Sequence, residues 1–308
     1  MKDSVPGWLE HGVLVYGPRK GGTTLFQNLL DGTPEMLVYP AELKLKFFAR
    51  DGSKMDDIAT YYEKSRIATV KSPNFDTDAY EARWAAVLRE GKLSSFAEFI
   101  RFDALAVQQS IGGGASSQPA LWAAKEVGGP TDAILANWKR IFPEGKALFI
   151  VRNPLMVTRA VLNDRRRKNV RLSIREIIHQ ALDPLAVVTA QAKYLADPYV
   201  HVLAYEDLVA DTAGEMKKIA DFLGIAYSPV LNTPTIFGEP QVVRTSSRKT
   251  TEVFAPVETW NEGLTRRERL AVKLATRFAS SKPRYSADYP ALRAAITAKH
   301  AALPVQKS

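Results

Sequence analysis

Six consecutive residues in the segment GPRKGGTT, residues 17–24, combine the properties of an anion-binding loop. Glycine lets the backbone approach a bound anion closely, and a helix that begins after such a loop points free N–H groups and its positive end at one place. One arginine and one lysine add positive charge, and two threonines add hydroxyl donors. An ordinary glycine-rich turn is the alternative. The predicted phosphate-binding residues are Arg19, Lys20, Gly21, Gly22, Thr23 and Thr24.

The loop differs from that of nucleoside triphosphatases, G-x-x-x-x-G-K-[ST]. Gly17 and Gly22 have the spacing of the two glycines, but Thr23 stands where the triphosphatase lysine would be. The lysine of this chain comes earlier, at Lys20, from where it cannot lie along the β and γ phosphates in the usual way. The sequence therefore predicts binding of a phosphate-like group and disfavours ATP hydrolysis.

Strands and helices that alternate along the chain must position this loop. Short apolar runs predict strands at 13–16, 67–70, 147–151 and 200–204. Helical spacing of apolar residues follows the loop from residue 23, and further helices are expected at 131–142, from about 155, and up to Gly224. Such alternation is typical of an α/β fold, here a P-loop-like central parallel sheet flanked by helices. We expect one domain over residues 1–308, with 76–119 as an acceptor-facing insertion and fraying from Lys299.

Composition excludes several classes of site. The chain has 308 residues with 42 Lys and Arg against 33 Asp and Glu, a formal charge of +9, no Cys and four His. A thiolate zinc site, a cysteine nucleophile and a disulfide scaffold are therefore excluded. The basic surplus favours an anionic partner. No apolar run reaches the ~20 residues of a membrane span, and without a signal peptide the expected localisation is cytoplasmic.

The run PRKGGTTLFQNLL resembles the 5′-phosphosulfate loop of sulfotransferases that use 3′-phosphoadenosine 5′-phosphosulfate (PAPS), and its Lys-Gly-Gly-Thr form is similar to the carbohydrate, heparan-type branch. The segment FIVRNP, residues 149–154, resembles the family's 3′-phosphate motif. The segment 205–225 and the basic stretch 246–249 are similar to later family landmarks, in the same order. The resemblance covers residues 17–264, most of the chain.

The resemblance implies a role for several residues in binding the donor. Lys20 would stabilise the leaving phosphate oxygen, and Arg152 would hold the 3′-phosphate, to which a guanidinium fork is well suited. The family's serine eight residues after this arginine is Ala160 here, so Thr158 or Arg159 would have to donate instead. The remaining residues of the implied donor site are Tyr205 near the adenine and Arg248 and Lys249 near the 3′-phosphate. A strand-end aromatic and a solvated charge pair are the alternatives for these three.

The same resemblance points to residues for proton transfer and for the acceptor. Glu42 is the only carboxylate in the segment where the heparan-type branch carries its general base; an exposed or ion-paired role beside Lys44 or Lys46 is the alternative. A second lysine is expected ahead of Arg152. Lys125 is favoured for the phosphosulfate side and Lys71 for the substrate cleft, with a surface lysine as the alternative for each.

The resulting hypothesis is a PAPS-dependent sulfotransferase that acts on a hydroxyl, less readily an amine, of a carbohydrate or small-molecule acceptor, with no metal expected. The basic run 165–168 would hold an acidic acceptor or form a solvated helix face. The alternatives are a P-loop nucleotide kinase and a non-catalytic nucleotide-binding protein. Nucleic acid is not an expected partner, because no recognised nucleic-acid-binding motif is present.

Overall fold

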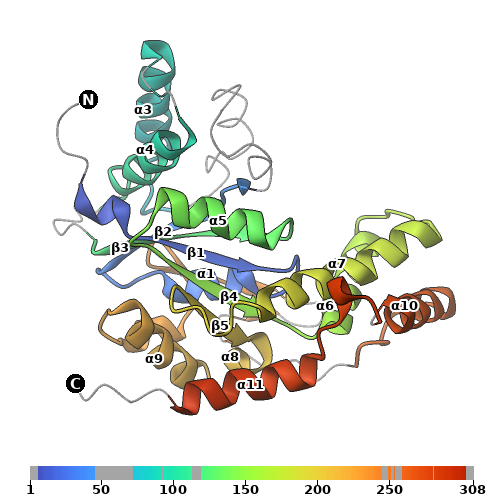
Figure 1. Cartoon of the computed structure of the whole chain (residues 1–308). Helices are drawn as coiled ribbons and strands as arrows, with labels where there is room; N and C mark the ends of the chain where they lie inside the picture. Colours follow the sequence, from blue (N-terminus) through green and yellow to red (C-terminus); the bar gives the residue numbers. More distant parts are fainter. Residues whose placement is uncertain are drawn as a thin grey trace.

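A central sheet of five parallel strands organises the computed structural model, in the order β2-β3-β1-β4-β5 (Figure 1). The structure describes residues 6–45, 72–91, 93, 95–112, 119–244, 249–250, 253, 259–279 and 281–302. The strands are β1 (Gly12–Gly17), β2 (Met36–Glu42), β3 (Leu121–Val127), β4 (Lys146–Val151) and β5 (Val200–Ala204). The predicted α/β fold with a central parallel sheet is therefore confirmed.

Helices cover both faces of the sheet (Figure 1). They are α1 (Thr23–Leu30), α3 (Thr77–Glu90), α4 (Phe96–Gln108), α5 (Thr131–Ile141), α6 (Pro154–Arg167), α7 (Ile174–Ala192), α8 (Tyr205–Ala210), α9 (Thr212–Leu223), α10 (Arg266–Ala279) and α11 (Tyr289–Ala302). Short 3₁₀ turns occupy Gly7–Glu10, Pro229–Asn232 and Pro283–Tyr285. Two small antiparallel pairs join β6 (Thr235–Ile236) to β7 (Glu239–Pro240) and β8 (Val243–Arg244) to β9 (Lys249–Thr250).

Alternation along β1 divides the core between the two faces. All six residues of the strand are buried, as expected for a central parallel strand. Val13 and Val15 belong to one apolar cluster with side chains of α1, α8 and α9. Leu14 and Tyr16 belong to a second cluster, built with side chains of α4, α5, α7 and α11. The sheet thus holds the carboxyl end of β1, where the predicted loop begins, between two packed layers.

Local signals in the sequence account for several helix boundaries. Pro154 begins α6, and the side chain of Asn153 caps it by accepting a hydrogen bond from the N–H of Leu155. Ser173 and Glu176 form a capping box at the start of α7. Gly224 ends α9 in the left-handed conformation at φ 76°.

The structure also departs from the expected elements. The sequence pattern did not predict β2 or β3, although β3 lies between β2 and β1 in the sheet. The expected fraying from Lys299 is wrong, because α11 continues to Ala302. The strand expected at 67–70 lies outside the described residues. Within the described ranges, no helix combines the length and the apolar character needed to cross a bilayer.

The segment 76–119 forms two helices, α3 and α4, in its described part. Their apolar faces meet through Trp84, whose ring centroid lies 4.8 Å from that of Phe99 and 4.7 Å from that of Phe102. The carboxylate of Asp103 accepts hydrogen bonds from the Tyr80 hydroxyl at 2.7 Å and the Trp84 indole N–H at 3.0 Å. These contacts make the helix pair a packed unit.

Candidate active site

The predicted phosphate-binding loop lies between β1 and α1, as expected. The Gly21 N–H donates to the Pro18 carbonyl at 2.8 Å, which closes the turn. Gly22 has a φ of 105°, and a Cβ at this position would lie 2.4 Å from a ring carbon of Tyr205. Any side chain larger than hydrogen would therefore strain the backbone and displace the tyrosine. Glycine at residue 22 lets the loop close directly onto a residue that follows β5.

Arg152, which follows β4, joins this loop to Tyr205. Its guanidinium lies 4.1 Å from the centroid of the Tyr205 ring, and its Nη1 donates to the Lys20 carbonyl at 2.9 Å. A guanidinium stacked on an aromatic face is held in a fixed plane. The buried Nε of Arg152 has no hydrogen-bond partner among the described residues. Arg152 also lines the cavity described below, where its guanidinium charge is suited to an anionic ligand.

Lys20 extends across the loop to α6. Its ammonium nitrogen lies 3.1 Å from Oδ1 of Asp164. The other carboxylate oxygen of Asp164, Oδ2, lies 3.1 Å from the ammonium nitrogen of Lys168. Burial acts to raise the pKa of Asp164, but hydrogen bonds from Lys168 and Lys20 outweigh it and hold the pKa below its usual value. Lys20 therefore faces an ionised carboxylate across the loop.

Lys125 and Glu42 are neighbours across the β2–β3 pair. Glu42 is opposite Lys125 in the register, after an irregularity that begins beyond Val38. The ammonium of Lys125 donates to the hydroxyl of Thr24 at 3.0 Å, which connects β3 to the first turn of α1. Glu42 also lies 3.4 Å from Lys44. The sequence-predicted pair therefore meets beside the phosphate-binding loop.

Burial lowers the pKa of Lys125 to about 8. The nearby charge of Glu42 acts in the opposite direction, and Lys44 adds to the lowering. The side chain is thus close to its titration point at neutral pH, which is unusual for lysine and is a common property of functional sites.

One cavity of about 880 Å³ lies at the carboxyl ends of the strands. Its lining includes Lys20, Glu42, Lys125, Arg152 and Tyr205. The volume falls within the range of roughly 300–1,000 Å³ that is usual for small-molecule sites. Seven of the lining residues are Arg or Lys and two are Asp or Glu. Those seven are Arg19, Lys20, Lys44, Lys125, Arg152, Arg159 and Arg167, and the two acids are Glu42 and Asp183. The cavity is therefore suited to a ligand with several negative charges.

One face of α6 contributes cavity residues that were not predicted as a group. Arg159, Asn163 and Arg167 line the cavity, and their spacing of four residues is the signal that could have found them. Ala160, where the family pattern has serine, lines it too. Thr158, one of the two suggested replacements, is buried and donates to the Pro154 carbonyl at 2.8 Å. Of the two, only Arg159 is a lining residue.

Other predicted residues lie partly or wholly outside the described structure. Lys71 and Arg248 are not described. Lys249 begins β9, opposite Arg244 of β8, and only its backbone is described. No described residue of 76–119 lines the cavity. The described ranges contain no group of three or more His, Asp or Glu placed to hold a metal ion.

The fold and site define an α/β protein with a P-loop-like anion site at the carboxyl edge of a parallel sheet. Residues 12–229 match the sequence model of the sulfotransferase family. The chain belongs to the sulfotransferase family, which confirms the resemblance seen in its motifs. No curated protein sequence matches the chain significantly.

Two solved sulfotransferase domains share this fold. The sulfotransferase domain from the curacin biosynthetic pathway is 16% identical, with a TM-score of 0.52 over 85% of this chain and 96% of that domain. The domain from the Synechococcus PCC 7002 olefin synthase is 17% identical, with a TM-score of 0.52 over 87% of this chain and 94% of that domain. A mouse sulfotransferase complexed with PAP is 12% identical, with a TM-score of 0.49 over 95% and 94% of the two chains.

Proposed function

We propose that the protein transfers a sulfuryl group from PAPS to a hydroxyl of a carbohydrate or other small acceptor. The observation that carries the proposal is the convergence of Lys20, Lys125, Arg152 and Glu42 on one basic cavity. Three of these side chains are cationic and suited to a nucleotide with a 3′-phosphate and a 5′-phosphosulfate. The fourth is a carboxylate, a group that can accept the proton of an acceptor hydroxyl.

The charge of the cavity lining is suited to the donor. The guanidinium of Arg152 is suited to phosphate oxygens, and Arg159 is the replacement we favour for the family's serine. The N-terminal turn of α1 and the hydroxyls of Thr23 and Thr24 are suited to the 5′-phosphate. Tyr205 offers an aromatic ring for the adenine, next to the guanidinium of Arg152.

Sulfuryl transfer requires charge stabilisation on one side of the sulfur and proton removal on the other. The acceptor oxygen forms a bond to sulfur while the bond from sulfur to the bridging oxygen breaks, so negative charge develops on the leaving 5′-phosphate. Lys20 and Lys125, which both line the cavity, would stabilise that charge. Glu42 would take the proton of the acceptor hydroxyl. The leaving group is then 3′,5′-adenosine bisphosphate (PAP).

A second cavity offers room for the acceptor. It has a volume of about 1090 Å³ and shares Gly129 and Asp183 with the first cavity. Asp132, Lys193 and Arg284 give it polar groups of both signs, beside apolar side chains of α7. This lining favours a polar organic molecule with hydroxyl groups, and a screen of such acceptors with labelled PAPS would identify it.

The donor assignment is tested by thermal unfolding with PAP in the presence of EDTA. We expect PAP to raise the Tm without magnesium, because a ligand at 100 times its Kd stabilises the folded state by about 2.7 kcal/mol. Adenosine lacking both phosphates is the matched control and should leave the Tm unchanged. Stabilisation by magnesium-ATP alone would instead favour the nucleotide kinase.

The lowered pKa of Lys125 predicts a pH dependence of donor binding. An anion binds the protonated amine better, so the Kd of PAP should rise as pH increases through about 8, by at most tenfold per pH unit. Titration calorimetry between pH 7.5 and 9.5 measures this, because phosphate groups with a second pKa of about 6 are already ionised there. In Lys125→Met, PAP binding should be weaker at pH 7.5 and should lack this rise. An unchanged profile in that variant would show that another group titrates.

A further inference from the structure

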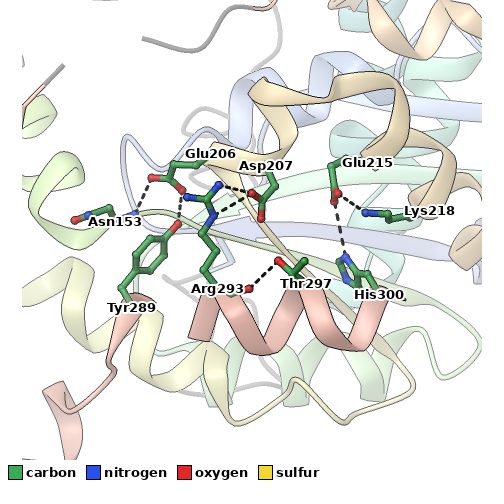
Figure 2. A network of polar contacts seen from close by, with 9 residues as sticks. All are labelled: Asn153, Glu206, Asp207, Glu215, Lys218, Tyr289, Arg293, Thr297 and His300. Carbon is green, nitrogen blue, oxygen red and sulfur yellow. Dashed lines mark hydrogen bonds and ion pairs between the residues drawn. The ribbon is translucent and has the colours of Figure 1, made fainter. Parts of the chain in front are cut away.

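Helix α11 is connected to residues of the donor site through hydrogen bonds, although it lies far beyond residues 12–229, which match the family. Figure 2 shows its side chains directed at the start of α8 and at α9. The hydroxyl of Tyr289 donates to Oε2 of Glu206, and Oε1 of Glu206 accepts the backbone N–H of Asn153 at 3.2 Å. Asn153 follows Arg152 directly, so one carboxylate connects α11 to the peptide that carries the predicted 3′-phosphate arginine.

Further contacts fix α11 in place. The Nε of Arg293 donates to Oδ1 of Asp207 at 3.0 Å, one residue after Glu206 (Figure 2). Tyr289, Leu292 and Ile296 are buried in the main apolar cluster. The helix is therefore a rigid support rather than a loosely attached end.

Tyr289 is maintained as a hydrogen-bond donor. Burial raises the pKa of its hydroxyl well above the usual value, and the charge of Glu206 raises it further. The phenol therefore stays protonated at neutral pH and remains a hydrogen-bond donor to Glu206. The same carboxylate accepts from the backbone N–H of Asn153, so it connects α11 to that residue.

Glu206 lies between two groups of the donor site. Along the chain it follows Tyr205, whose ring contacts Gly22 of the phosphate-binding loop. Through its hydrogen bond it restrains Asn153, next to Arg152. The guanidinium of Arg152 stacks on the Tyr205 ring at 4.1 Å. Each member of this stacked pair is therefore next in the chain either to Glu206 itself or to the residue that Glu206 bonds. Removal of a hydrogen bond from Glu206 would loosen this pair.

We infer that Tyr289 and Glu206 are positioning residues that hold Arg152 and Tyr205 in the geometry that binds the donor. The inference rests on the proposed function, because the donor site supplies its readout. It assigns α11 a part in donor affinity, in addition to its part in the core. Neither residue lines the cavity, so both would act through their neighbours.

The test compares PAP binding by calorimetry in the full-length protein, its Tyr289→Phe variant and a Thr297→Val control. Thr297 lies on the same helix, and its hydroxyl donates only within that helix, to the Arg293 carbonyl. We expect Tyr289→Phe to raise the Kd of PAP about 3- to 10-fold, the effect of one lost hydrogen bond. The KM for PAPS should rise equally, with kcat at saturating donor within about twofold. Thr297→Val should leave both values unchanged.

A double-mutant cycle separates positioning from general destabilisation. If Tyr289 acts through Arg152, Tyr289→Phe should change the Kd of PAP less than about twofold once Arg152→Ala is present. Glu206→Gln should retain most of the affinity, because an amide can accept from the Asn153 N–H and donate to the Tyr289 oxygen, whereas Glu206→Ala should lose it.

Three results would overturn the inference. They are unchanged PAP affinity in Tyr289→Phe, equal effects of Tyr289→Phe with and without Arg152, and equal affinity losses in Glu206→Gln and Glu206→Ala. A different result, no PAP binding by the unaltered protein, overturns the donor assignment and the positioning role with it. Failure of the inference and failure of the proposed function are therefore distinguishable.

Discussion

Replacing Lys20 with alanine should lower kcat for sulfuryl transfer by about 100- to 1,000-fold, the usual cost of removing one group that stabilises transition-state charge. Lys20 lies in the loop that faces the 5′ end of the proposed donor, where charge develops as the sulfur–oxygen bond breaks. Its side chain is 38% exposed and is paired with Asp164 across the loop. Asp164 also pairs with Arg167 and Lys168, so Lys20 can leave it for the donor without leaving the carboxylate unpaired.

The measurement is kcat and the Kd of PAP in the same variant. Affinity for PAP should fall by much less than kcat, because the ground-state product has other cationic partners in the cavity. Lys273→Ala is the matched control, since this lysine is exposed on α10 and lies outside the cavity. A kcat within tenfold of the unaltered protein would contradict the role of Lys20.

Replacing Glu42 with glutamine should lower kcat by about 100- to 10,000-fold, the range associated with loss of a general base. Glutamine keeps the size of the side chain but cannot accept the acceptor's proton at neutral pH. Because Glu42 pairs with Lys125 in the register and lies 3.4 Å from Lys44, the substitution also removes a counter-charge from two lysines. PAP binding should therefore be retained or slightly strengthened.

Asp183→Asn provides the comparison for Glu42, because Asp183 is the other carboxylate that lines the cavity. We expect this variant to retain more than a tenth of the turnover. The opposite pattern, with Asp183→Asn inactive and Glu42→Gln active, would assign the role of general base to Asp183 of α7. Single-turnover measurements with PAPS bound in advance would separate either result from a change in donor affinity.

The phosphate-binding loop was predictable because its signals are local. Glycines, threonines and a lysine within eight residues specify a strand, a turn and a helix start, and β1 and α1 form there. The caps of α6 and α7 are local as well. The strand β5 was predicted with its observed bounds, because four of its five residues are apolar and a short apolar-rich run is typical of a buried strand.

The pairing of Glu42 with Lys125 could not be predicted in the same way. It depends on β2 and β3, and both strands have weak local signals: Pro40 interrupts the first, and a lysine and a glutamate end the apolar run of the second. Their partnership joins residues 83 positions apart, as the register pairs Glu42 with Lys125. Tyr289 and Glu206 likewise meet across a separation of 83 residues. Such contacts depend on tertiary packing, so no short sequence motif predicts them.

The position of α11 also bears on how the chain avoids aggregation. Among the described residues, strand β5 is the outermost strand on one side of the sheet, and the strand it pairs with is β4. The backbone groups on the outer edge of such a strand can pair with another chain unless they are covered. Helix α11 runs alongside this strand and buries Leu292 and Ile296 in the core (Figure 1). A chain that ends before residue 289 would expose an apolar strand edge that can pair with another molecule. We therefore expect α11 to shield this edge of the sheet from self-association.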